Sequence, residues 1–180
     1  MTVKGLKTQT LQTADNVSGL VLLNTTSFSG VSSFNLAAST FTSAYKNYKI
    51  VAQGTASSAD SNAVYVRMRA SGSDDTSSNY FSWGYERSNS AGSNFYGGNG
   101  TFGYVGAIAN LGWSFESNFY DPQATAATKI VSNSLALGTN SNIMYMFGSV
   151  FKNTTSFDSA TIYGWTGTIT GTYSIYGYNA

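Results

Sequence analysis

TGTITGTYSIYGYNA, residues Thr166–Ala180, is the stretch that decides the fold of this 180-residue chain. It has no charged side chain, and it is built from the β-branched, aromatic and small residues that fit a pleated sheet. Its alternation predicts a strand with an apolar face (Ile169, Tyr173 and Ile175) and a largely polar face (Thr168, Thr170, Thr172, Ser174 and Tyr176). Because no Lys or Pro protects its edges, we expect this strand to be interior or covered by another subunit.

Similar strand patterns recur upstream. In VYVRMRA (64–70), one face carries Val64, Val66, Met68 and Ala70, and the other carries Tyr65, Arg67 and Arg69. In LGWSFESNF (111–119), Leu111, Trp113, Phe115 and Phe119 alternate with Gly112, Ser114, Glu116 and Asn118. Further strand candidates are LVLLNTTSFS (20–29), 48–53, YFSWGYERS (80–88), IVSNSLALG (130–138), IMYMFGSVF (143–151) and TIYGWTGTI (161–169).

The remaining segments read as turns and loops. SGSDDTSSN (71–79) and DPQATAAT (121–128) have loop chemistry. Phe41, Tyr45 and Tyr48 have helical spacing, so we expect at most one or two short helical turns, near residues 38–47. The sequence shows no long amphipathic helix to connect parallel strands, so the predicted sheets are antiparallel. We therefore predict an all-β, jelly-roll-like antiparallel β-sandwich over residues 20–180, preceded by an extended N-terminal arm over residues 1–19.

Composition excludes several classes of protein. Charged residues make up 9% of the chain, aromatic residues 15%, and the net charge is +1, so the chain has neither the composition of a disordered protein nor the basic footprint of a nucleic-acid binder. It contains no Cys and no His, which excludes disulfides, Ser-His-Asp triads and His-ligated zinc. No apolar run approaches the roughly 20 residues of a membrane-spanning helix. The N-terminus lacks the apolar core of a signal peptide, so we expect folding in a cytoplasm, without membrane or nucleic-acid partners.

Three motifs raise the question of chemistry. Gly98, Gly100 and Gly103 form a G-x-G-x-x-G, but a strand-like segment follows, so we predict a hairpin loop with a type I′ turn at Asn99-Gly100. Glu86 and Glu116 could be the two carboxylates of a glycosidase, although solvated or Arg-paired glutamates are the preferred interpretation. Asp60, Asp74 and Asp75 are oxygen ligands of the kind that calcium binds, but loop solubility explains them more simply. We expect no catalytic residue, metal or cofactor.

Three sets of residues are candidates for binding partners. We predict a subunit interface from Tyr and Arg enrichment, formed by Tyr65, Arg67, Arg69, Tyr176 and Tyr178. A Gly- and Asn-rich aromatic region suggests a recognition surface, with core packing as the alternative, formed by Tyr85, Arg87, Phe95, Tyr96 and Phe102. The arm contributes a candidate attachment segment, with a frayed terminus as the alternative, formed by Lys4, Leu6, Lys7 and Leu11.

Four segments, in this order, resemble a β-sandwich module of virion proteins from tailed bacteriophages, including phages of cyanobacteria and marine bacteria. They are GLVLLNTTSFSGVSSFNL (19–36), FTSAYKNYKIVAQG (41–54), VYVRMRASGSDDTSSNY (64–80) and GTITGTYSIYGYN (167–179). Residues 85–151 carry no part of the resemblance. Such modules occur in tail-fibre, head-fibre and capsid-decoration proteins.

The resemblance implies a non-enzymatic structural protein of the virion, assembled in the host bacterial cytoplasm as a homotrimer. Its implied partners are further copies of itself and other capsid or tail proteins. The alternative is a fibre-tip module that binds a host receptor or surface glycan. No catalytic residue is implied.

Overall fold

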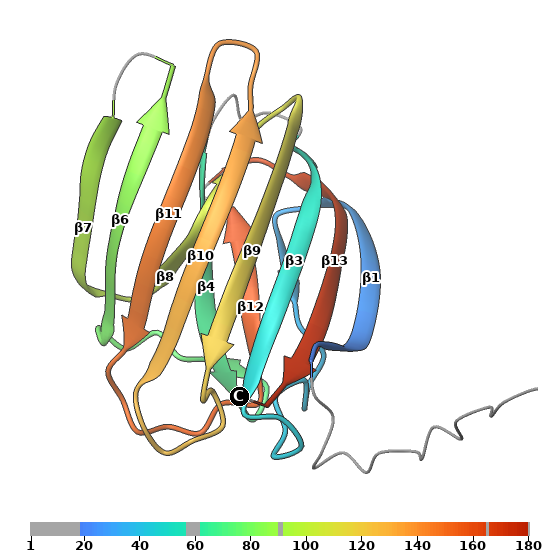
Figure 1. Cartoon of the computed structure of the whole chain (residues 1–180), viewed down its shortest axis with the longest axis vertical. Helices are drawn as coiled ribbons and strands as arrows, with labels where there is room; N and C mark the ends of the chain where they lie inside the picture. Colours follow the sequence, from blue (N-terminus) through green and yellow to red (C-terminus); the bar gives the residue numbers. More distant parts are fainter. Residues whose placement is uncertain (1–18, 57–61, 90–91, 165, 180) are drawn as a thin grey trace, which may run out of the picture.

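The computed structural model describes residues 19–56, 62–89, 92–164 and 166–179, which form two antiparallel β-sheets packed face to face (Figure 1). The larger sheet comprises β1 (Val21–Val31), β3 (Asn47–Ala56), β6 (Tyr80–Ser88), β7 (Gly92–Gly100), β9 (Gly112–Tyr120), β10 (Thr128–Leu137), β11 (Asn142–Phe151) and β13 (Ile169–Tyr178). The smaller sheet comprises β2 (Ser33–Asn35), β4 (Asn62–Ala70), β5 (Ser73–Asp74), β8 (Gly103–Ile108) and β12 (Ser159–Gly164). The predicted all-β sandwich is confirmed.

Strand order places segments that are distant in sequence side by side. The larger sheet runs β1-β13-β3-β9-β10-β11-β6-β7, and the smaller runs β2-β12-β4-β5, with β8 also paired to β4. The final strand, β13, is hydrogen-bonded to β1 on one side and to β3 on the other. Its residues Ile169, Tyr173 and Ile175 are all buried between the sheets. The prediction of an interior terminal strand with this apolar face is therefore confirmed.

The core between the sheets is rich in aromatic rings. Phe34 of the smaller sheet stacks on Tyr173 of the larger one, with ring centroids 4.7 Å apart. The apolar face predicted for β4 also points inward, since Val64, Val66 and Met68 are buried. These rings supply the large contact areas that an interior of short strands needs.

The helical turns considered possible near residues 38–47 are not formed in the described structure, which agrees with the prediction of at most one or two such turns. Within the described residues of this segment there are only turns, one of them closed by the bond from the Thr40 amide to the Ala37 carbonyl, 3.1 Å. The Tyr48 hydroxyl donates to the Thr42 carbonyl (2.7 Å) and accepts from the Thr42 amide (2.6 Å). Phe41 therefore folds back on Tyr48, with centroids 4.8 Å apart, from a loop rather than from a helix.

The hairpin predicted around Asn99-Gly100 is wrong. These two residues end β7, which pairs with β6, whereas β8 pairs with β4 in the other sheet. Thr101 and Phe102 thus carry the chain from one sheet to the other. A strand rather than a helix follows, so the segment lacks the structure of a dinucleotide-binding loop.

Two smaller expectations differ in outcome. The loop expected around Pro122 is confirmed, since 121–127 separates β9 from β10. Leu111 was expected on the buried face with Trp113 and Phe115, but it precedes β9 and is 58% exposed. Its amide bonds the Leu137 carbonyl (3.0 Å), which holds it at the end of the sheet rather than between the sheets.

Candidate functional site

Strand β10 departs at several positions from the polarity expected for a sandwich. Its inward residues include Ser132 and Ser134, which are buried. Its outward residues include Val131, Leu135 and Leu137, which are 47%, 61% and 51% exposed. Since exposure of large apolar side chains is unfavourable and hydroxyls are well solvated in water, this arrangement indicates that the outward face has a role other than folding.

The buried serines are explained by the close approach of β8. The Ser134 hydroxyl accepts from the Ala107 amide (2.9 Å), and that of Ser149 accepts from the Tyr104 amide (3.1 Å). A Cβ atom on Gly106 would lie only 3.0 Å from the Ser134 Oγ atom, so there is no room for larger side chains. The serines therefore satisfy the free edge of β8 while letting the two sheets come together.

The outward side chains form a continuous surface over β10 and its neighbours, which we call the apolar patch. Cross-strand pairing joins β10 to β11 and β11 to β6, and β3 lies one strand beyond β9. The patch consists of Val51 (39% exposed), Trp83 (44%), Tyr85 (40%), Val131, Leu135, Leu137, Met144 (39%) and Met146 (52%). Large apolar side chains this exposed are common singly on a soluble protein, but a group of eight on one sheet face is typical of an interaction site.

A hollow of about 390 Å³ lies within the patch. Val51, Leu135, Met144 and Met146 contribute to its walls, and Asn133 and Glu116 add polar groups. The Lys49 ammonium lies 2.6 Å from the Glu116 carboxylate, and this hydrogen bond and charge lower the Glu116 pKa. The charges beside the hollow thus form their own neutral pair.

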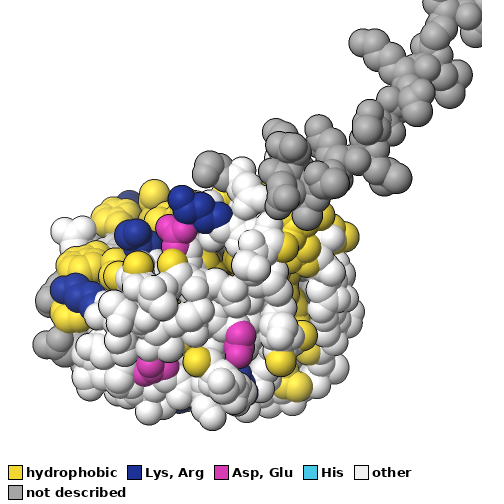
Figure 2. Space-filling model, turned by 90° about the horizontal axis from the view of Figure 1, so that it is seen from below, with side chains coloured by type: hydrophobic (Ala, Val, Ile, Leu, Met, Phe, Trp, Pro, Cys, Tyr) yellow, Lys and Arg dark blue, Asp and Glu magenta, His cyan; other side chains and the backbone are white. Residues whose placement is uncertain are grey.

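Charges are sparse elsewhere on the molecule as well. Figure 2 shows, at the lower end of the molecule, only a few charged side chains among uncharged polar and apolar surface. Low surface charge leaves little electrostatic repulsion to keep copies of the chain apart.

The predicted recognition residues do not form one surface. Tyr85 and Arg87 project from the outer face of β6, where Tyr85 belongs to the apolar patch. Phe95 and Tyr96 lie in strand β7 and not in the loop expected for them. Phe102 lies in the connection from β7 to β8 and packs on Tyr65 of the smaller sheet, with ring centroids 4.3 Å apart. Tyr85 and Arg87 therefore lie on the outer face of the larger sheet, and Phe102 lies apart from them.

The predicted interface residues are likewise divided. Arg67 and Arg69 lie on the outer face of β4 and are half-buried, whereas Tyr65 on the same face is only 6% exposed, because the rings of Phe102, Tyr104 and Tyr163 pack against it. Tyr176 and Tyr178 alternate with Ile175 and face outward from the larger sheet. Since the outer faces of a sandwich point away from each other, these five side chains cannot contact one flat partner together.

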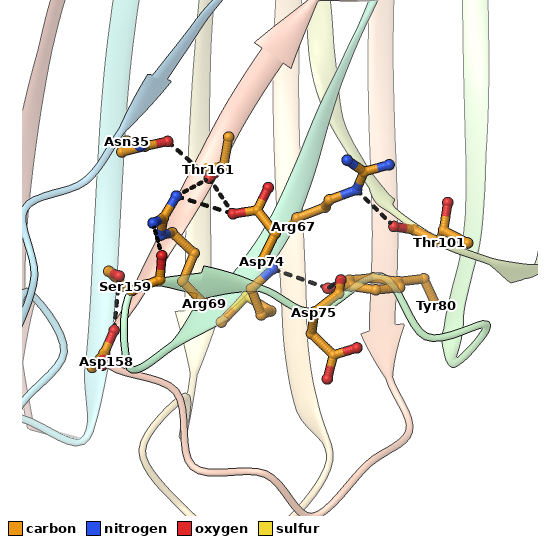
Figure 3. Close-up of polar contacts among 12 residues, drawn as sticks. Asn35, Arg67, Arg69, Asp74, Asp75, Tyr80, Thr101, Asp158, Ser159 and Thr161 are labelled. Carbon is orange, nitrogen blue, oxygen red and sulfur yellow. Dashed lines mark hydrogen bonds and ion pairs between the residues drawn. The ribbon is translucent and has the colours of Figure 1, made fainter.

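The guanidinium group of Arg69 forms hydrogen bonds to residues of β5, of β12 and of the turn between β4 and β5 (Figure 3). Its Nη1 atom lies 3.0 Å from the Asp74 carboxylate and 2.9 Å from the Thr161 hydroxyl, and Nη2 bonds the Gly72 carbonyl. The Thr161 hydroxyl in turn bonds Asp74 (2.6 Å). These bonds tie β5 and the turn that precedes it to β4 and β12. Arg67 donates to the Thr101 carbonyl (3.1 Å) and lies over the Tyr163 ring.

The acidic residues show no arrangement for metal binding or hydrolysis. Among the described residues there is no group of three or more metal-binding side chains, and Asp60 lies outside that part of the chain. Glu86 is on the inner face of β6, where burial and its negative charge raise the Tyr145 pKa. Glu116 is on the outer face of β9, so the suggested carboxylate pair is wrong: the sheet itself separates the two groups.

The candidate attachment residues Lys4, Leu6, Lys7 and Leu11 lie outside the described residues. In the part of the chain that the structure describes, no helix has the length and hydrophobicity to cross a membrane.

The apolar patch was missed in the sequence because its strands carry apolar residues on both faces. One signal was present: in VSNSLAL (131–137), serines alternate with Val, Asn and Leu. No protein-family model, no curated protein and no solved structure matches the chain, so the site is interpreted from its geometry.

Proposed function

We propose that this protein is a non-enzymatic structural component of a bacteriophage virion, which assembles as a homo-oligomer on the surface of the head or tail. It would act there as a decoration protein or a short fibre. The observation that carries self-assembly is the apolar patch, in which leucines and methionines face solvent while serines are buried. An exposed apolar surface of this size is typical of a protein–protein interface.

The assignment to a virion is supported by the resemblance of the four segments 19–36, 41–54, 64–80 and 167–179. In the larger sheet the segments are neighbours, since β13 lies between β1 and β3, whereas in the smaller sheet β2 and β4 flank β12, which is outside the resemblance. The contiguous part of the resemblance is thus the β1-β13-β3 edge of the larger sheet. The homotrimer rests on this resemblance alone.

The test is the position of the protein on purified particles of the phage that encodes it. We expect mass spectrometry to find the chain in density-purified virions, and labelled antibodies to bind at regular positions on the particle. The purified protein should bind particles that lack it and should not bind host cells. Its absence from washed, infectious particles would contradict a structural role.

Attachment through the arm can be tested separately. Because residues 1–18 precede β1, their deletion leaves all the described strands in place. We expect the shortened protein to fold and self-associate but to fail to join the particle. Incorporation at the full-length level would show that attachment lies in the sandwich instead.

A second candidate function is recognition of a host surface glycan at a fibre tip. It is favoured by Trp83 and Tyr85, which lie two residues apart on the outer face of β6 and are 44% and 40% exposed. Aromatic faces of this kind stack on the apolar faces of sugars. Binding of host cells or surface polysaccharide by the purified protein, lost in Trp83→Ala with its oligomeric state retained, would favour this function over decoration.

A further inference from the structure

A second apolar surface lies at the far edge of the larger sheet. Leu20, Leu22 and Leu23, at the start of β1, are 54%, 56% and 39% exposed. We call these three residues the β1 leucines. In the described part of the chain, β1 is the end strand of its sheet, and residues 21–31 contain no charged residue and no Pro. This edge thus lacks the usual protection against association.

The edge is poorly suited to simple strand addition. The pairing of β1 with β13 shifts register between Leu22 and Asn24 and again between Phe28 and Val31, where Gly30 has a φ of 62°. Such bulges twist an edge away from a flat, hydrogen-bonding template. What β1 presents to a partner is therefore mainly its leucine side chains.

The β1 leucines and the apolar patch are separate surfaces. Three strands, about 19 Å across the sheet, separate β1 from β10, where Leu135 lines the hollow; Val51, the patch residue nearest to β1, lies on β3, with β13 between. The β13 residues beside Val51 and Gln53 are Ser174 and Thr172, so polar side chains interrupt the apolar surface there. One continuous apolar area cannot account for both surfaces.

We infer that the β1 leucines of one copy insert into the hollow of the apolar patch of a second copy, in a head-to-tail contact. This inference rests on the proposed self-assembly and names the surfaces that carry it. A symmetric patch-to-patch dimer would cover one surface and leave the leucines exposed. A head-to-tail contact covers both with one kind of interface, and it forms closed rings such as a trimer when the rotation between copies closes.

The chemistry of the two surfaces is compatible with this contact. No charge on β1 has to be desolvated, and the charges next to the hollow, Lys49 and Glu116, already neutralise each other at 2.6 Å. Met144 and Met146 line the hollow, and methionine side chains adapt readily to the shape of an inserted group.

Complementing variants test the inference. Leu135→Glu places a charge in the hollow, and Leu22→Glu places one on the β1 edge; both residues are exposed, so both variants should fold. The matched control is Gln53→Glu, on the polar strands between the two surfaces. By light scattering at tens of micromolar, we expect the unmodified protein and the control to be oligomeric, and each of the two variants alone to be a monomer of 19.1 kDa.

The decisive measurement is the mixture of the two variants. Each retains the surface that the other has lost, so an equimolar mixture should form heterodimers of twice the monomer mass. A Leu22→Glu variant that stays fully oligomeric, or a mixture that stays monomeric, would overturn the head-to-tail contact. A monomeric unmodified protein would instead overturn self-assembly, and hence the proposed function, so the two failures are distinguishable.

Discussion

Removing the charge of Arg69 is expected to destabilise the fold by about 2–3 kcal/mol, the cost of lost hydrogen bonds to a charged group. In Arg69→Met the aliphatic stem is kept, but the bonds to Asp74, Thr161 and Gly72 are lost. The side chains of Arg69 and Asp74 are 17% and 25% exposed. The pair thus lies between solvent-exposed ion pairs, worth about 0–1 kcal/mol, and fully buried ones, whose disruption costs about 3–5 kcal/mol.

A double-mutant cycle isolates the interaction between the two groups. Asp74→Asn keeps an oxygen that can accept from the Thr161 hydroxyl, so we expect it to cost only about 1 kcal/mol. The coupling energy from urea unfolding of both single variants and the double variant should be about 1–2 kcal/mol, and it should persist at 1 M salt because the pair is shielded from solvent.

The matched control is the ion pair of Lys46 and Asp121, at 3.9 Å with side chains 60% and 30% exposed. Its coupling energy should be below about 0.5 kcal/mol and should vanish at high salt. Equal couplings for the two pairs, or a value for Arg69–Asp74 below that of the control, would refute the assignment of this network as a clasp between β4, β5 and β12.

Three further predictions follow from burial. Burial raises the pKa values of Tyr65 and Tyr80, so above about pH 10 the unfolded chain loses protons that the folded state keeps. Stability should therefore be constant below that pH and fall above it. Urea midpoints measure the stability, and absorbance at 295 nm follows the ionisation of the tyrosines. Ile175→Ala should lower the free energy of unfolding by about 2–5 kcal/mol, whereas Ser174→Ala, the neighbouring outward position, should lower it by less than about 1 kcal/mol. Equal losses would contradict the burial of Ile175 between the sheets. Deletion of residues 168–180 removes the strand between β1 and β3 and should yield aggregated protein, which a soluble product with a strand-type circular dichroism spectrum would contradict.

Strands with one apolar and one polar face could be oriented from the sequence. In β13, Ile169 and Ile175 alternate with threonine and serine, and in β4, Val66 and Met68 alternate with arginine. Burial of the apolar side is strongly favoured, so only one orientation is compatible with a core. These two strands were placed correctly with respect to the core, and the absence of crossover helices indicated antiparallel sheets.

The candidate surfaces could not be predicted because they depend on non-local pairing. Tyr65 and Tyr176 resemble each other in their strands, yet the strand order puts them on opposite sides of the sandwich. In β10, Ile130 and Val131 are both apolar, so alternation does not say which faces inward. The orientation is determined by β8, whose Ala107 amide bonds Ser134 from 27 residues away.

The apolar patch therefore contributes little to the stability of a single copy, and its free energy becomes available only on association. Leu135 is 61% exposed, whereas Ile130, on the opposite face of the same strand, is 2% exposed. Each large apolar side chain that a partner buries fully contributes about 1.5–3 kcal/mol, and the sum of these contributions has to exceed the cost of association and of ordering flexible side chains. The residues that fold this chain and those that would assemble it thus occupy opposite faces of the same strands.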